Sequence, residues 1–410
     1  MKKLLLVLLI LSLFINHLNA NEKDLQIIQK DKKEYRLLDK ESIQTRQQSQ
    51  KYDWISPIDL SGNIGRNHSF SDENSRNLNN KNTKSASIGF TQSIFESGGI
   101  GFKMDYADNR FKYEMLSWEN QNSQLIYTIY NTLLDIKKLK LEINQNDYRI
   151  VNKDIELIIK KIQYEAGKTD IIELNNAIMS KNLILKEEIA LKNSLKEKEQ
   201  ELAKYTDLKY DEIEILDFQE TNKDIFLDKN YSILEADAKV EMLNSEYKIK
   251  KSQYLPKLSL SAKASYLNKD EKFNSMISDT NKDDATSSGS LILSMPLYDY
   301  TKSSKVQESK IEVLKQKALV NDLKNETAFE YEQIFTKIDT YLKQNETINK
   351  NIKLYEELIG ANQISSEAGM TSKYDLEILE NTKTINEFDI LINKINILQQ
   401  YAKLYFKIKN

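Results

Sequence analysis

An alternating stretch in the second half of the chain places the strongest limit on its fold. Between positions 258 and 266 every second residue is apolar, and the residues between them are three serines and a lysine. A repeat of two is typical of an extended strand with one apolar and one polar face. A tilted strand of about nine to eleven residues is long enough to cross a bilayer. The stretch therefore predicts an amphipathic strand of membrane length.

A long helix is expected directly before this strand. The preceding run is charged and free of proline, and Pro256 marks the change because proline cannot donate the next helical hydrogen bond. The whole chain has 410 residues but only 3 prolines and 10 glycines, which favours long uninterrupted helices. The run 102–164 contains neither residue, and at 1.5 Å per residue it predicts a helix of about 95 Å.

The same plan occurs twice along the chain. Pro57 and Pro256 are 199 positions apart, and the sequence Glu-Ala-Gly that ends at Gly167 returns 202 positions later at Gly369. The segment that starts with Ile94 matches the one that starts with Leu297, 203 positions on. Landmarks that keep a nearly constant offset in the same order indicate an internal duplication.

This duplication divides the chain into three expected parts. Residues 1–20 have a basic start, an apolar run too short to span a membrane and a final alanine, which is typical of a signal peptide. The first repeat is expected at 21–220, with a helix, strands at about 57–66 and 84–95, a long helix, a turn at 165–170 and a return helix. The second is expected at 221–410, with a helix, strands at about 256–267 and 288–297, a long helix, a turn at 367–372 and a return helix.

Each long helix and its return helix are expected to form an antiparallel coiled coil. Apolar residues keep a spacing of three and four along the second pair, and they are expected to form the packed seam. On the long helix they are Tyr331, Ile334, Ile338, Tyr341, Ile348, Ile352, Tyr355 and Ile359, with Asn345 as the one polar member. On the return helix they are Phe388, Leu391, Ile395, Leu398, Ala402 and Tyr405.

Composition limits the chemistry that the chain can perform. There is no cysteine, which excludes disulfides, thiol catalysis and thiolate metal sites. The net charge of −3 argues against nucleic acid as a partner. His68 lies in a run expected to be a polar loop, and no nucleophile with a base and no metal-ligand cluster stands out. We expect no enzyme activity and no cofactor.

In this order of motifs the chain resembles the TolC family of outer-membrane efflux ducts. The resemblance covers the mature chain and includes the segment 254–260, the strand-to-helix corners 93–98 and 296–299, and the turns around Gly167 and Gly369. It implies a mainly α fold in which long coiled-coil helices form an α-barrel. It also implies a homotrimer in which four strands from each chain build a twelve-stranded membrane β-barrel. Four strands are too few to close a barrel, so the number of strands requires an oligomer. It does not decide between two and three copies.

The resemblance implies a function as the outer-membrane channel of a tripartite efflux or type I secretion system. Substrates would pass passively from a periplasmic adaptor and an inner-membrane pump to the exterior. The channel would contact outer-membrane lipid and extend into the periplasm, with the loops 66–84 and 268–287 outside the cell. The alternative is a structural coiled-coil protein of the periplasm or cell surface without a pore, which would not need strands of bilayer length. The exported substrate is left open.

The resemblance also implies three groups of site residues. The acids that follow the turn glycines by six positions, Glu173 and Asp375, are gate candidates, although Ile378 replaces a second gate acid and both acids also fit helix capping boxes. Residues that would contact the adaptor at the turns are Gly167, Lys168, Thr169, Gly369, Met370 and Thr371. Aromatic residues that flank the strand ends and would lie at the membrane interface, or simply pack, are Trp54, Phe95, Tyr254 and Tyr298.

Overall fold

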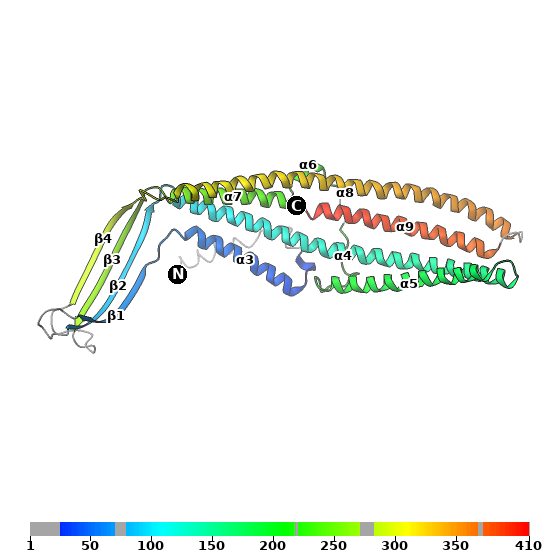
Figure 1. Ribbon diagram of the computed structural model, residues 1–410, viewed down its shortest axis with the longest axis horizontal. Helices are drawn as coiled ribbons and strands as arrows, with labels where there is room; N and C mark the ends of the chain where they lie inside the picture. Colours follow the sequence, from blue (N-terminus) through cyan, green and yellow to red (C-terminus); the bar gives the residue numbers. More distant parts are fainter. Residues whose placement is uncertain are drawn as a thin grey trace, which may run out of the picture. The chain divides into compact units, whose positions relative to one another are not determined.

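The computed structural model describes residues 25–69, 79–216, 218, 220–270, 283–367 and 372–409. The expected signal peptide at 1–20 lies outside them. The elements in chain order are η1 (Leu25–Ile27), α3 (Lys30–Tyr52), β1 (Asp59–Ser69), β2 (Asn79–Phe95), α4 (Gly99–Glu165), α5 (Ile171–Leu202), α6 (Lys223–Asp228), α7 (Tyr231–Ser252), β3 (Lys257–Asp270), β4 (Asp283–Ser294), α8 (Lys302–Glu367) and α9 (Lys373–Tyr405) (Figure 1).

The expected fold class is confirmed. The two longest helices, α4 with 67 residues and α8 with 66, each follow a pair of strands, and each is followed by a return helix, α5 or α9. The helices reach these lengths because neither contains proline and because leucine, lysine and glutamate, which favour helices, are frequent. None of the described helices has a stretch that is long and apolar enough to cross a membrane.

The four strands form one antiparallel sheet in the order β1-β2-β3-β4. The strands are longer than expected at their loop ends. Pairing continues to Ser69 with Asn79 in the first hairpin and to Asn268 with Asp283 in the second, inside runs that were expected to be loops. Backbone hydrogen bonds do not require apolar side chains, so a polar composition does not end a strand. His68 accordingly belongs to β1 and not to a loop.

The long helix expected at the start of the second repeat, directly before the strand around Leu258, is interrupted, which corrects the prediction. It consists of α6 and α7, and Asn230 between them forms an isolated bridge with Ile408 near the end of the chain. The backbone N–H of Tyr231 donates to the carbonyl of Lys407 at 2.9 Å. Phe226 on α6 is completely buried. The break exists because the chain end competes for the backbone of this segment, which local sequence does not reveal.

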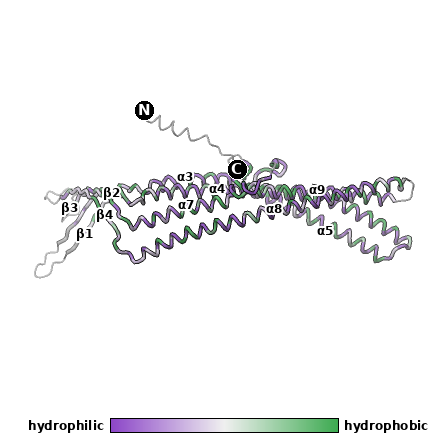
Figure 2. The backbone as a smooth tube through the Cα atoms, turned by 90° about the horizontal axis from the view of Figure 1, so that it is seen from above, coloured by the Kyte–Doolittle hydropathy of each residue, from purple (hydrophilic) through white to green (hydrophobic). Residues whose placement is uncertain are grey.

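The chain forms two compact units, and each is described by itself. One unit, Glu41–Met115 with Glu235–Val320, contains the sheet and the helical segments joined to it. The other unit contains the remaining helical segments, among them α5, α9 and the turn between α4 and α5. Apolar and polar residues interleave along the helices (Figure 2), as expected for helices that pack on one side.

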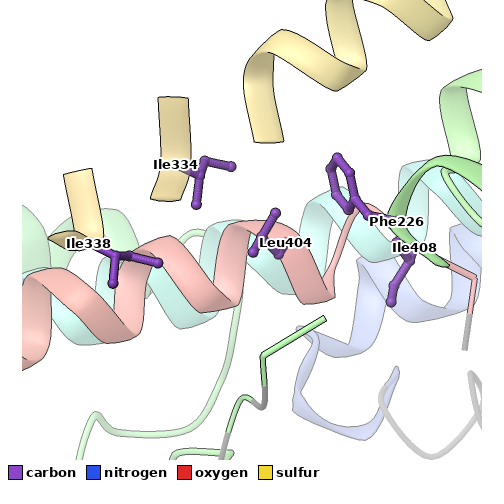
Figure 3. Packing of buried hydrophobic residues seen from close by; sticks show 5 residues of the cluster. All are labelled: Phe226, Ile334, Ile338, Leu404 and Ile408. Atoms are coloured by element: carbon purple, nitrogen blue, oxygen red, sulfur yellow. The ribbon is translucent and has the colours of Figure 1, made fainter. Parts of the chain in front are cut away.

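Two residues of the expected coiled-coil seam, Ile334 and Ile338, lie in a buried cluster of the unit that contains α9. Phe226, Ile334, Ile338, Leu404 and Ile408 make a buried cluster (Figure 3). Farther along α9 the prediction was wrong at Leu391, which is 42% exposed. Asn393 is buried instead, and its amide donates to Asn345 on α8 at 2.9 Å. The seam therefore passes through a polar pair, which fixes the register of two helices at some cost in stability.

Candidate functional site

The turn between α4 and α5 has a well-defined hydrogen-bond pattern. The N–H of Gly167 donates to the carbonyl of Tyr164 at 3.0 Å, and the N–H of Lys168 donates to that of Gln163 at 2.8 Å. These two bonds are those of a Schellman motif. Gly167 has φ of +69°, the left-handed region that the motif requires, and a Cβ there would meet no atom within 4 Å. Backbone conformation alone therefore selects glycine at this position.

Glu173 serves the start of α5 in two ways. Its backbone N–H donates to Oδ1 of the N-cap residue Asp170 at 2.9 Å, which is the capping contact expected from the sequence. Its carboxylate lies 3.1 Å from Nζ of Lys160 on α4. The two side chains are 51% and 35% exposed, so this is a solvated ion pair that fastens the two helices near the turn. The negative charge of Glu173 is thus partly compensated within its own chain.

The second turn is described only on its α9 side. Gly369, Met370 and Thr371 lie outside the described residues. Ser372 is the N-cap of α9, and its hydroxyl oxygen accepts from the N–H of Tyr374 at 3.2 Å. Asp375 lies in the first turn, is exposed, and donates its backbone N–H to the carbonyl of Ser372 at 3.1 Å. Unlike Glu173, its carboxylate is not in an ion pair with any described residue.

Polar contacts between α4 and α9 were not expected from the sequence. Gln145 donates to Asp389 at 2.7 Å, and Asn152 donates to Thr382 at 3.3 Å. Gln399 donates to Asp135 at 2.7 Å farther along. Gln145 and Asn152 are seven apart, as are Thr382 and Asp389. Polar residues at a heptad spacing on both helices were the signal that could have predicted this antiparallel contact.

A cluster of charges links α8 to the C-terminal end of α9. The carboxylate of Glu330 lies 2.8 Å from Nζ of Lys403 and 2.6 Å from that of Lys407. Burial by itself would raise the pKa of Glu330. The hydrogen bonds and charges of the two lysines outweigh this effect, so that the pKa is lowered from its ordinary value. The ion cluster therefore stabilises this junction while Glu330 is ionised.

The sheet has two chemically different faces. Hydroxyl groups meet across the strands on one face, with 2.8 Å between the Oγ atoms of Ser61 and Ser87 and 3.0 Å between those of Thr91 and Ser261. The other face carries large apolar side chains in the open, such as Leu60 at 79% exposure and Leu293 at 73%. Such an apolar face needs a covering of lipid or protein, whereas the hydroxyl face suits water.

A shallow depression of about 430 Å³ lies on the hydroxyl face. Lys263 lines it, and Gly89 lies opposite Lys263 on β2. A Cβ at Gly89 would come within 3.3 Å of Cβ and Cγ of Lys263, so the glycine leaves room for the lysine. Asp59 is the β1 partner of Gly89 and lines the same depression. The charged side chains of Lys263 and Asp59 thus both line the hydroxyl face of the sheet.

The four aromatic residues at the strand ends have different surroundings. Phe95 and Tyr298 are 53% and 84% exposed, which suits contact with a second molecule or a membrane interface. Tyr254 is only 7% exposed and its ring lies 5.4 Å from Nζ of Lys302, which favours packing. The carbonyl of Trp54 accepts from the amide of Gln92 at 3.0 Å, which fixes the entry into β1.

The described residues contain no cluster of three or more potential metal ligands from histidine, cysteine, aspartate and glutamate. The arrangement that they do show combines an amphipathic sheet, paired long helices and a capped turn. Such an arrangement can line a channel and contact other proteins.

Comparison with known proteins agrees with this architecture. Residues 224–403 match the family described as Outer membrane efflux protein. No curated protein matches the chain by sequence.

Several solved structures share the fold. The outer membrane protein VceC of Vibrio cholerae is 12% identical with a TM-score of 0.72, over 93% of this chain and 94% of that one. The CmeC outer membrane channel of Campylobacter jejuni is 13% identical with a TM-score of 0.70, over 92% and 84%. The MtrE outer membrane channel of Neisseria gonorrhoeae is 11% identical with a TM-score of 0.69, over 94% and 87%. Residues 224–403 thus match the family of outer membrane efflux proteins, and nearly the whole chain shares the fold of these solved outer membrane proteins.

Proposed function

We propose that this protein is the outer-membrane channel of a tripartite efflux or type I secretion system. Three copies would form one duct, which receives substrates from a periplasmic adaptor and an inner-membrane pump and releases them outside the cell. Transport through the duct is passive, and the chain performs no catalysis. In this proposal residues 1–20 direct export, and the repeats at 21–220 and 221–410 each contribute two strands and one helical hairpin.

The sheet is the observation that carries the proposal. Its exposed apolar face suits outer-membrane lipid and its hydroxyl face suits a wet lumen. Each strand has at least eleven residues, enough to cross a bilayer when tilted. Among the described strands, the outer strands β1 and β4 are each paired along one edge only. Several copies that join at these edges remove the open edges and close a barrel.

The helical turns are the proposed meeting point with the adaptor. Gly167, Lys168 and Thr169 in the first turn and Gly369, Met370 and Thr371 in the second would contact it. Glu173 and Asp375 would narrow the passage near the turns, because carboxylates from three chains create a negative field that admits cations more readily than anions. The carboxylate of Glu173 also pairs with Lys160 on α4, so it would serve both the passage and the contact between the two helices.

Reconstitution of the purified protein tests this function. The protein is extracted from membranes in detergent, its mass is measured by light scattering, and it is added to a planar lipid bilayer. We expect a particle with the mass of three chains and stepwise single-channel currents. A monomer without channel activity in bilayers would contradict the proposal and favour a coiled-coil protein without a pore.

A further inference from the structure

One junction between strands and helices is closed within the chain. There the corner Glu96–Gly99, which follows β2, packs against the corner Ser252–Pro256, which precedes β3; we call this the inner joint. The hydroxyl of Ser97 donates to the carbonyl of Pro256 at 2.7 Å. Glu96 and Ser252 are only 9% and 4% exposed. A Cβ placed on Gly99 would lie 2.8 Å from Oγ of Ser252, so the first residue of α4 touches the last residue of α7.

The internal duplication provides an equivalent for each side of the inner joint. Helix α3 ends at Tyr52 and α7 ends at Ser252. The turns that follow match, because the N–H of Ile55 donates to the carbonyl of Tyr52 at 2.9 Å and that of Leu255 donates to the carbonyl of Ser252 at 3.0 Å. Helix α8 begins at Lys302 as α4 begins at Gly99. Tyr52 therefore corresponds to Ser252, and Lys302 corresponds to Gly99.

The two equivalent corners, at the end of α3 and at the start of α8, are at opposite edges of the sheet and are exposed to solvent in a single chain. One precedes β1 and the other follows β4, and these strands are the two outer strands of the sheet. Their side chains are correspondingly exposed, unlike those of the inner joint. Tyr52 is 62% exposed, Ile55 is 50%, Leu297 is 91%, Tyr298 is 84% and Tyr300 is 87%.

We propose that a second copy of this chain closes the open corners in the geometry of the inner joint. The start of α8 in one copy packs on the end of α3 in the next copy, with Lys302 against Tyr52. The inference rests on the proposed function in that it assumes a homotrimer, and it adds which residues meet. The contact is head-to-tail, because the two corners are different surfaces, and three such contacts close a ring.

The chemistry of the two residues fits this contact. Nζ of Lys302 already lies 5.4 Å from the ring centroid of Tyr254 in its own chain, so the ammonium group is held beside an aromatic ring. Tyr52 of the next copy would offer a second aromatic surface to the same ammonium, in a cation–π contact. The exposed Tyr300 would be covered at the same time. Lipid could cover the exposed apolar side chains of these corners, but it would not place Tyr52 of one copy next to Lys302 of another.

Cysteine cross-linking tests the contact directly, because the natural chain has no cysteine. The variant Tyr52→Cys with Lys302→Cys is purified in detergent, oxidised and run on a denaturing gel. We expect bands with the mass of two and three linked chains that collapse on reduction, because a disulfide forms only when the two Cβ atoms lie within about 4.5 Å. Each single-cysteine variant should remain at the mass of one chain.

Two further double-cysteine variants serve as controls for this cross-link. Ser252→Cys with Gly99→Cys reproduces the inner joint and should form its disulfide within one chain, without a higher-mass band. Tyr52→Cys with Glu308→Cys moves the partner six residues along α8 and should not cross-link. Linked chains from both the 302 and the 308 pair would overturn the proposal, because they would show that the copies have no defined register.

The failure of this inference is distinguishable from the failure of the proposed function. Trimers that conduct in bilayers, but in which only the inner-joint pair forms its disulfide, would overturn the contact and leave the channel intact. A protein that neither associates nor conducts would refute both. A measurement without oxidation checks the result: Lys302→Glu should lower the trimer fraction in detergent, and Tyr52→Lys in the same chain should restore it. No loss of trimer with Lys302→Glu would also contradict the contact.

Discussion

Removal of the positive charge of Lys160 tests how the acids near the helical turns contribute to ion selectivity. Nζ of Lys160 lies 3.1 Å from the carboxylate of Glu173, whereas the carboxylate of Asp375 has no ion pair with a described residue. In a homotrimer each acidic position supplies three carboxylates. The lysine offsets the charge at position 173, so Asp375 should provide more of the negative field than Glu173 does.

The structure sets the expected size of each effect. Lys160→Gln removes an exposed ion pair, which costs only about 0.2–1 kcal/mol of stability. The cap at Asp170 remains, since it accepts from the backbone of Glu173. With the lysine gone, we expect the cation-to-anion permeability ratio to rise about twofold, which corresponds to about 0.4 kcal/mol. Asp375→Asn should lower the ratio at least as much, and Glu173→Gln should change it less.

Reversal potentials in planar bilayers under a salt gradient measure these ratios. Lys161→Gln is the matched control, because it makes the same charge change one residue away from the pair with Glu173 and should have a smaller effect. An equal shift for both lysine variants would refute the argument from the ion pair. Unchanged selectivity in Glu173→Gln combined with Asp375→Asn would show that both acids act only at their own helices.

Three further predictions concern the turn, the ion cluster and the topology. Gly167→Ala should destabilise the turn by about 1–2 kcal/mol because of the positive φ at this position, and Gly167→Val should destabilise it by more. Both variants should still assemble as trimers but export less. Normal export by the valine variant in a drug-sensitivity or secretion assay would contradict this prediction. The lowered pKa of Glu330 means that its contribution to stability is present above its ordinary value of 4.5 and is lost as the pH falls through the folded-state pKa. Glu330→Gln should therefore cost about 1–3 kcal/mol at pH 7 and flatten the loss of stability in acid, measured by thermal unfolding; identical acid profiles would count against the role of Glu330. Cysteines at Ser75 and Ser275, which lie outside the described residues, should react with an impermeant thiol reagent on intact cells, and unreactive cysteines in protein that has reached the outer membrane would reject the external placement of these loops.

Much of the architecture followed from local sequence patterns. The alternation around Leu258 predicted a strand with two different faces, because side chains of a strand point alternately to opposite sides. The absence of proline and glycine between 102 and 164 predicted one long helix, which the structure extends only to Gly99 and Glu165. Gly167 predicted the turn and the capping box around Glu173 predicted a cap, because both depend on residues that are neighbours in the chain, and the structure assigns the cap to Asp170.

Only the tertiary structure decided the features that depend on residues distant in the chain. The helix break at Asn230 requires the backbone of Ile408, and the pairing of Gln145 with Asp389 requires α4 to lie beside α9. The charge of Glu173 is likewise compensated by a lysine on another helix. Sequence periodicity shows which face of an element is buried. It does not show which element will cover that face, because this choice depends on how all the elements pack together.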